Sequence, residues 1–368
     1  MYAQEGVGSR FQMEVVVVDD ASSDRTEQVV RSFSATRYIR LPTNAGSAAA
    51  RNAGIRASTG EYVAFLDDDD LSLPYRLSLQ VPALEAAPEA GVLYSQYIDW
   101  HKGRAHIWPP SPSPSGMVFR QLLLTNFMTS ANALVRRDAL ERVGHFDETL
   151  PTAEDYDLWL RLAFYVPFRF QPGPVTIVRH PDSGKSLSHL AAGTKNRFVH
   201  LVVERALALI ADSQDFPRFS RQVRARGGLR GVNLAAWLGD SGQLRTELLR
   251  ALRETPFLIR DPWARSALAW HALQLVAESE TPIEAARALS AELRSVVNGR
   301  GVREAYGMRL VLAELWKGLA RELAEQPTPQ YREAASAALL AIRFHPAVFG
   351  RTLLGILLRG PRPPRSRR

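Results

Sequence analysis

The sequence of 368 residues contains no cysteine. This absence excludes disulfides, thiolate zinc sites, iron–sulfur clusters and cysteine nucleophiles, so any metal would be held by carboxylates, water or imidazole. The sequence also lacks an apolar run of about 18 residues, and the acids near its start do not suit a secretory signal. We therefore expect a cytoplasmic protein. With 46% hydrophobic and 23% charged residues, the composition is typical of a globular protein.

The formal net charge of +8 is concentrated at the C-terminus. Residues 343–368 contain seven arginines and no acid, which leaves 39 basic and 38 acidic residues in the remainder. Because the body is neutral, a nucleic-acid partner is not indicated. The Pro- and Arg-rich residues 359–368 are typical of a disordered tail. Together with the apolar turn before them, these arginines could instead contact anionic lipid at the inner face of a membrane.

Two regions differ in their hydrophobic pattern. Short β-branched runs alternate with amphipathic stretches from residue 14 to about 180, which predicts an α/β domain with a mainly parallel sheet between helices. Helical spacing dominates from about 190 to 358. We therefore expect an α/β domain at 1–190, a helical domain at 191–358 and a tail at 359–368. Expected strands are 14–18, 38–41, 62–66 and 92–98, expected helices include 47–57 and 74–86, and 101–117 is expected to be a flexible loop.

Acids follow two of the expected strands. Asp19 and Asp20 come directly after a valine run, and Asp67–Asp70 follow Tyr62–Leu66. Ligands of open parallel sheets bind at the carboxyl ends of strands, so these are candidate site residues. Four adjacent carboxylates repel one another, and a bound cation would remove that cost. Oxygen ligands without sulfur indicate Mg²⁺ or Mn²⁺, which share their coordination with substrate phosphates. The alternative is a solvated acidic turn.

Arg51 lies between the two acidic segments, in a loop of small residues that runs into an Ala-rich helix. Small side chains allow that helix to approach the sheet closely. Arg51 would then be a cation near several carboxylates or near a bound phosphate. Its spacing does not separate a role in phosphate binding from simple pairing with the acids.

A third acidic group lies at the start of an expected helix over 152–163. On that helix Glu154, Asp157 and Arg161 share a polar side, whereas Asp155 shares its side with Leu158 and Leu162. We therefore expect Asp155 to face inward. It could act as a general base near an acceptor hydroxyl, or it could only stabilise the helix start.

These three groups, in this order, resemble the inverting family 2 glycosyltransferases with the GT-A fold. The resemblance covers roughly residues 3 to 190, about half the chain. It is carried by EVVVVDDASSDRT, RLPTNAGSAAARNAGIRASTGEYVAFLDDDD and NFMTSANALVRRDALERVGHFDETLPTAEDYDLWLRLA. Three ordered motifs make it more specific than any one motif alone. The resemblance implies a GT-A-like sheet and transfer of a hexosyl group from a nucleotide-diphospho-sugar to an acceptor hydroxyl.

The resemblance also implies roles for individual residues. Asp19 and Asp20 would hold the nucleoside, Asp67 and Asp69 would match the family's Asp-x-Asp element that binds ribose and the divalent metal, and Glu154–Asp155 would supply the base, Asp155. Arg51 and Glu154 are expected to contact the substrate. The donor would be a UDP-, GDP- or dTDP-sugar, and the acceptor a glycan or lipid-linked molecule of cell-surface polysaccharide synthesis.

The sequence departs from the family pattern at its start. Family members have an apolar strand about 30 residues before the one that ends in Asp19, and this sequence begins too late to contain it. We expect either a truncated chain or a catalytically inactive module that binds a sugar nucleotide or a partner. A receiver domain and an Asp-x-Asp phosphatase fit less well. Lys102 precedes glycine rather than a cis-proline turn, and Asp67 is neither early in the chain nor followed by threonine.

Overall fold

The computed structural model describes residues 4–101, 104–109, 111–179, 194–229, 231–232, 235–236, 241–260, 262–277, 279–297, 302–325 and 330–345. It divides into two compact units, Met1–Ser213 and Gln214–Arg368. The division falls after the boundary expected at residue 190, because helix α8 (Thr194–Ala208) belongs to the first unit. There, Arg205 of α8 pairs with Asp147 at 2.9 Å.

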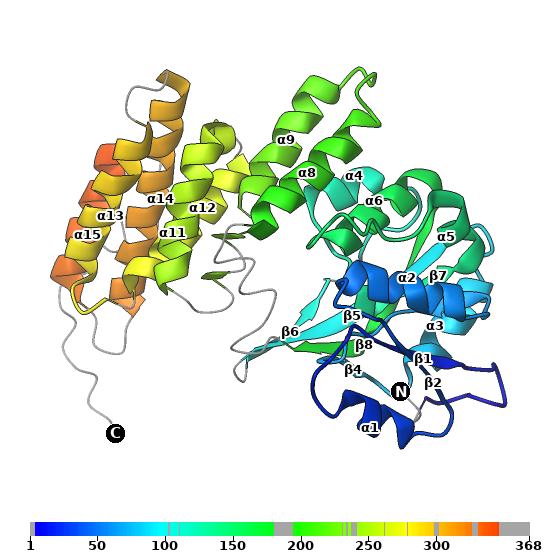
Figure 1. The fold of residues 1–368 in the computed structure, drawn as a ribbon. Helices are drawn as coiled ribbons and strands as arrows, with labels where there is room; N and C mark the ends of the chain where they lie inside the picture. The colour runs from blue at the N-terminus through cyan, green and yellow to red at the C-terminus, as the bar shows by residue number, and fades with distance from the viewer. Residues whose placement is uncertain are drawn as a thin grey trace, which may run out of the picture. The chain divides into compact units, whose positions relative to one another are not determined.

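The first unit alternates strands and helices, as Figure 1 shows. Helix α2 contains Arg51, and helix α6 begins with Glu154 and Asp155. The strands are β1 (Val15–Asp19), β2 (Thr36–Arg40), β3 (Tyr62–Ala64), β4 (Leu71–Ser72), β5 (Val92–His101), β6 (Arg104–Trp108), β7 (Ala133–Arg136) and β8 (Phe168–Arg179). The helices before α8 are α1 (Thr26–Arg31), α2 (Ser47–Ala57), α3 (Arg76–Glu85), α4 (Phe119–Leu124), α5 (Arg137–Val143) and α6 (Glu154–Tyr165), with a short 3-10 turn at Ser130–Asn132.

The predicted α/β class with a helical C-terminal region is confirmed, but the sheet is mixed rather than mainly parallel. In the larger sheet the order is β3-β7-β5-β8-β4, with β6 paired to β5. Only β5 and β8 pair in parallel there. The reason is that β7, a strand from much later in the chain, inserts antiparallel between β3 and β5. Sequence periodicity identifies strands but does not order them.

Strand β1 lies outside this larger sheet. In the described residues it pairs with β2 alone, in parallel, with Val15 opposite Thr36. The valine run predicts a buried strand, yet Val16, Val17 and Val18 are only half-buried. Helix α2 packs on β1, where Gly54 lies close to Val18. The start of β1 is tied to the start of β3, because Glu14 accepts hydrogen bonds from the amides of Thr59 and Gly60 at 2.5 and 2.8 Å.

The prediction of a loop over 101–117 is wrong in its first part. Its first part is strand β6, which forms an antiparallel hairpin with β5. The Pro-rich residues that follow include two prolines after cis peptide bonds, Pro109 and Pro112. The basic and proline residues around this segment indicated a loop, although the segment also contains the β-branched and aromatic residues that favour pairing with β5. Figure 1 shows the hairpin extending away from the rest of the sheet.

The core of the first unit surrounds β5. Leu93 packs with Val81 and Leu84 of α3 on one face. On the other face Tyr94 stacks on Phe127, with ring centroids 5.0 Å apart, and contacts Phe170. Burial of these large apolar side chains on both faces holds β5 rigidly.

The second unit is helical in its described residues. It contains a core of Leu, Ala and Val with the buried Trp316. No described helix in the chain combines the length and apolar character that crossing a membrane requires. The tail at 359–368 lies outside the described residues. The elements are α9 (Phe216–Gly228), α11 (Ser241–Glu254), a 3-10 helix (Pro256–Arg260), α12 (Pro262–Ala277), α13 (Pro282–Val297), α14 (Val302–Glu325) and α15 (Tyr331–Phe344).

We expect Gly91→Ala to destabilise the first unit. A β-carbon at Gly91 would lie 2.6 Å from Cγ2 and 2.8 Å from Cβ of Val166, at a junction held by backbone hydrogen bonds. Relieving that overlap costs roughly 1–3 kcal/mol. Gly54→Ala is the matched control, because its β-carbon would meet Val18 at an ordinary 3.6 Å inside α2. Denaturant unfolding should show a loss for the first variant, and an equal midpoint for both would contradict the packing described.

Candidate active site

The Arg51 guanidinium links two acidic segments that are far apart in the sequence. Arg51, on α2, donates to Asp67 after β3 at 2.7 Å and to Glu154 at the start of α6 at 2.8 Å. Its charge also lies over the ring of Phe146, at 5.4 Å from the centroid. The Arg51 side chain is mostly covered, at 14% exposure, so these charge-assisted bonds are largely shielded from water. The structure therefore brings the second and third sequence motifs together.

Glu154 is the buried half of the Glu-Asp pair. Its Oε1 accepts a hydrogen bond from the Ser47 hydroxyl at 2.6 Å as well as the one from Arg51. Burial would raise the pKa of Glu154, but the charge of Arg51 and the Ser47 hydrogen bond outweigh it and lower that pKa. Glu154 therefore stays ionised and holds the start of α6 against the start of α2.

Asp155 has the opposite electrostatic environment. Its pKa is raised to about 6, first by burial and then by the neighbouring charge of Glu154, while Arg51, the Tyr156 amide and Lys195 oppose the shift. The Tyr156 amide donates to Asp155 Oδ1 at 2.7 Å. A pKa near neutrality suits a group that accepts a proton during a reaction.

The helix sides differ in part from the prediction. Asp155 keeps partial contact with solvent, whereas Glu154 and Asp157 on the predicted polar side are both buried. Each of these two has an arginine partner, since Arg161 pairs with Asp157 at 2.8 Å. Helical periodicity alone would place Glu154 and Asp157 in water, but their ion pairs with arginine allow both carboxylates to be buried.

The four acids after β3 are not equivalent. Asp67 is partly exposed, Asp68 and Asp69 are exposed, and Asp70 is buried. Asp70 accepts a hydrogen bond from the backbone amide of Arg179 at 3.0 Å, and the Arg179 side chain donates to the Asp69 carbonyl, so β8 holds the turn. Partial desolvation raises the pKa of Asp69 even though the residue is exposed at the surface, and the charges of Asp67 and Asp68 add to the rise. This unfavourable charge density is what a cation would relieve.

The first acidic pair is occupied by its own chain. Asp19 accepts hydrogen bonds from the Ser22 amide at 2.7 Å, the Tyr38 hydroxyl at 2.5 Å and Arg40 at 2.6 Å. Although burial opposes the shift, these donors lower the pKa of Asp19 to about 2. Asp20 accepts from the amides of Ala45 and Gly46, at 2.6 and 2.8 Å, and so shapes the loop that enters α2. Nucleoside binding by the pair stays a prediction.

The acidic turn suits a hard divalent cation in part. Among the described residues, no group of three acidic or imidazole side chains is gathered as a complete metal site. Mg²⁺ and Mn²⁺, however, commonly use one or two protein carboxylates and complete their coordination with water and substrate phosphates. Asp69, with its exposed carboxylate and raised pKa, and Asp67 beside it are the oxygen donors that fit such a site.

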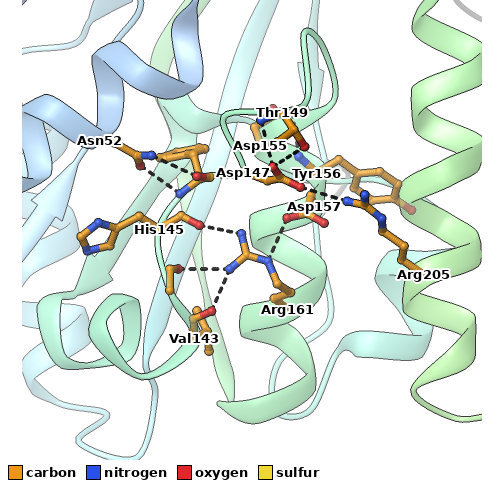
Figure 2. A network of polar contacts seen from close by, with 12 residues as sticks. Asn52, Val143, His145, Asp147, Thr149, Asp155, Tyr156, Asp157, Arg161 and Arg205 are labelled. Atoms are coloured by element: carbon orange, nitrogen blue, oxygen red, sulfur yellow. Dashed lines mark hydrogen bonds and ion pairs between the residues drawn. The ribbon is translucent and has the colours of Figure 1, made fainter.

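A polar network holds the loop before α6 in place, as Figure 2 shows. Arg161 donates to the carbonyls of residues 143, 144 and 145 at 2.9, 3.1 and 2.8 Å. Asn52, beside Arg51, exchanges two hydrogen bonds of 3.0 Å with the backbone of Phe146. Asp147 accepts from Arg205 of α8 at 2.9 Å. The loop is therefore anchored from three helices, and Phe146 is fixed over Arg51.

Sequence reasoning missed Ser47, Asn52 and Phe146. Ser47 lies one helical turn before Arg51, and Asn52 directly follows it, so both belong to the segment of small residues around Arg51. Their partners at Glu154 and Phe146 are about 100 residues away, and nothing in the local pattern indicates that contact.

Comparisons with known proteins show the family of this chain. A family model described as glycosyl transferase family 2 matches residues 4–144. An uncharacterized glycosyltransferase of Haemophilus influenzae is 30% identical over 210 residues, covering 55% of this chain and 70% of its own length. The chain belongs to glycosyl transferase family 2. Its first unit has the α/β architecture that the sequence pattern predicted, with a mixed sheet.

The remaining similarities are partial. An uncharacterized glycosyltransferase of Rickettsia felis is 30% identical over 232 residues, which is 58% of this chain but only 38% of that protein. The succinoglycan biosynthesis protein ExoO of Rhizobium meliloti is 45% identical over 87 residues, covering 23% of this chain and 24% of ExoO. Among solved structures, S. aureus TarS 1-349 is similar at 19% identity and a TM-score of 0.47, over 80% of this chain and 85% of that one.

We expect Arg51→Met to destabilise the first unit strongly, because it leaves Glu154 buried without its counter-charge. Removing one partner of such a pair costs about 3 kcal/mol. Arg56→Met on the same helix is the control, since Arg56 is 59% exposed and lies 3.9 Å from Glu148, a pair worth under about 1 kcal/mol. Chemical unfolding checks both, and adding Glu154→Gln to Arg51→Met should recover part of the loss. Similar losses in the two single variants would refute the assignment.

Proposed function

We propose that this chain transfers a hexosyl group from a nucleotide-diphospho-sugar to an acceptor hydroxyl with inversion at the anomeric carbon. The observation that carries the proposal is the position of Arg51, which joins Asp67 of the acidic turn to Glu154 beside Asp155. A donor diphosphate held at the acidic turn would thus lie next to a proton acceptor with a pKa of about 6. Membership in the glycosyltransferase family supports the same reaction class.

Asp155 is the proposed general base. As the acceptor oxygen forms its bond to the anomeric carbon, its proton passes to the Asp155 carboxylate, and the bond from that carbon to the diphosphate oxygen breaks. Attack from the face opposite the leaving group inverts the configuration, and the nucleoside diphosphate leaves with the bonding electron pair. Glu154, which stays ionised, raises the proton affinity of Asp155 and keeps it suited to this role.

The donor's charge is met by groups on two elements. We assign Arg51 to the diphosphate side of the donor and Asp19 and Asp20 to the nucleoside side, the latter partly through the loop at 44–46 that Asp20 holds. Asp67 and Asp69 are the proposed ligands of Mg²⁺ or Mn²⁺. When bound, such an ion supplies Lewis-acid stabilisation of the negative charge on the leaving diphosphate.

The biological setting that we propose is cell-surface polysaccharide or glycan synthesis. The similarity to ExoO, whose name refers to succinoglycan biosynthesis, supports that direction over its 87 matched residues. A UDP-, GDP- or dTDP-sugar donor and a glycan or lipid-linked acceptor fit this setting. We further propose a cytoplasmic location with peripheral contact to the inner membrane face through the arginines at 359–368.

Asp155→Asn should abolish transfer and donor hydrolysis while nucleotide binding is retained, because only the proton acceptor is removed. In the parent protein the rate should rise with pH through about 6, since Asp155 must be deprotonated. Asp138→Asn is a matched control, because Asp138 is also the second residue of a helix and accepts from its following amide at 2.7 Å. Radiolabelled donor turnover across pH 4.5–8.5, a range of about four units around that pKa, measures both. Donor turnover by Asp155→Asn at the parental rate would show that Asp155 is not the base, and no turnover by any form would favour a binding module instead.

Asp69→Asn should weaken the response to Mn²⁺ more than Asp68→Asn does. Both residues are exposed neighbours in one turn, but only the carboxylate of Asp69 is an assigned ligand. We expect on the order of tenfold more Mn²⁺ for half-maximal turnover with Asp69→Asn. Electron paramagnetic resonance of Mn²⁺ with nucleoside diphosphate reads binding independently of turnover. Full turnover in a strong chelator would remove the metal from the proposal.

A further inference from the structure

Strands β3 and β7 part directly before the acidic turn of Asp67–Asp70. The last residues that they pair are Ala64 and Leu134, and from Ala64 the chain continues through residues 65 and 66 into Asp67. Phe65 follows that last pair on one strand, and Ala133 precedes it on the other. A group that fixes the backbone at these two residues therefore fixes the direction in which the chain leaves the sheet.

Arg76 of α3 bridges the two strands at this point. Its guanidinium donates to the Phe65 carbonyl and to the Ala133 carbonyl, each at 3.1 Å. The planar fork of an arginine can hold two acceptors at once in a fixed geometry. Arg76 is only 1% exposed, so water does not compete for these bonds. Arg76 thus ties the end of β3 to the start of β7 where the acidic turn begins.

A second buried side chain of α3 orients Arg76. Gln80, one helical turn later, accepts from Arg76 Nε at 3.2 Å and donates to the Asn132 carbonyl at 2.9 Å. The Asn132 side chain in turn donates to the Ser95 carbonyl of β5 at 2.8 Å. This network joins α3 to β5 and to the start of β7. A buried polar network whose members are satisfied favours one arrangement of the surrounding core.

The charge of Arg76 is placed unusually. Among the residues that the structure describes, no carboxylate lies within ion-pair distance of Arg76. Burial lowers the pKa of Arg76 to about 10, and the charge of Asp70 opposes the shift, so the guanidinium stays charged at neutral pH. Burying a cation without a contacting acid is unfavourable. The acid whose charge reaches Arg76 is the last residue of the acidic turn, which connects the cation to that turn.

The other anchors of the turn hold its side chains. Arg51 binds the Asp67 carboxylate at 2.7 Å, and the Arg179 amide binds Asp70 Oδ1 at 3.0 Å. A metal ion that took the Asp67 carboxylate would weaken its bond to Arg51. The bonds of Arg76 go to backbone carbonyls instead, and a ligand of the acidic side chains does not displace them.

We propose that Arg76 is the positioning residue of the metal site. It holds the backbone from which Asp67 and Asp69 project, so that both carboxylates keep their places when Mg²⁺ or Mn²⁺ binds. Arg76 is buried and acts through the turn, without contact to the ion. The inference rests on the proposed function, because it uses the metal ligands assigned there.

Arg76→Lys tests the role of the fork, because an ammonium keeps the charge but cannot hold both carbonyls in the same geometry. We expect Mn²⁺ to bind on the order of tenfold more weakly, the effect of one charge-assisted hydrogen bond. Electron paramagnetic resonance of Mn²⁺ with UDP or GDP measures that affinity. Turnover at saturating Mn²⁺ should return to nearly the parental rate. A loss of turnover that excess Mn²⁺ does not restore would indicate general damage and overturn the inference.

Arg136→Lys is the matched control. Arg136 also donates to two backbone carbonyls, those of Ala90 and Leu84, both at 3.0 Å, but it lies at the other end of β7. This variant should keep the Mn²⁺ affinity within about twofold of the parent, since distant sites contribute independently. An equal loss of affinity in both lysine variants would overturn the inference.

Hydrogen exchange of residues 65–73 reads the position of the turn directly. In the parent protein, protection there should be nearly the same with and without Mn²⁺ and UDP, because Arg76 already holds the backbone. Exchange should be faster in Arg76→Lys and unchanged in Arg136→Lys. A large gain of protection in the parent on binding would show that the ion orders the turn, and would overturn the inference even if Arg76→Lys failed to fold.

The inference and the proposed function fail in different ways. A parent protein that binds Mn²⁺ with neither UDP nor GDP would overturn the proposed metal site, and this inference with it. Mn²⁺ binding of equal affinity in the parent, Arg76→Lys and Arg136→Lys would overturn the role of Arg76 alone.

Discussion

The ion pairs of Arg51 are the interaction on which the candidate active site depends. One guanidinium is shared by Asp67, which follows a strand of the sheet, and Glu154, which begins α6. Without it, two acidic segments about 90 residues apart would lie close together and repel. With it, Glu154 remains charged and raises the pKa of Asp155 next to it. The lowered pKa of Glu154 and the raised pKa of Asp155 thus both depend on the Arg51 guanidinium.

The support for Arg51 comes from side chains that have no direct part in the proposed reaction. Asn52 fixes the backbone of Phe146, and the Phe146 ring covers Arg51 on one side and meets Phe65 edge-on at 5.3 Å. Arg161 holds the preceding carbonyls of the same loop. Ordered residues around a charged group lower the reorganisation that a reaction would otherwise require. The loop before α6 is therefore part of the site even though none of its residues is a candidate for catalysis.

Much of the local structure could be predicted from the sequence, and the tertiary arrangement could not. Helix α2 has the predicted bounds, because small residues and helical spacing are local signals. The order of strands, the insertion of β7 and the pairing of β6 depend on contacts between distant residues, which no periodicity encodes. The same holds for the site: the acids and Arg51 were visible as motifs, but the partners Ser47 and Phe146 were not. The burial of Glu154 could not be predicted, because a charged residue is expected to face solvent unless its partner is known.

The sharing of Arg51 has a consequence for the order of events in turnover. A ligand that drew Asp67 toward itself would leave the whole guanidinium to Glu154, and a fuller neutralisation of that neighbour would loosen the hold of Asp155 on a proton. A ligand that bound first at Asp67 would thereby lower the proton affinity of Asp155 before the second ligand bound. The Arg51 side chain would then couple the two binding steps.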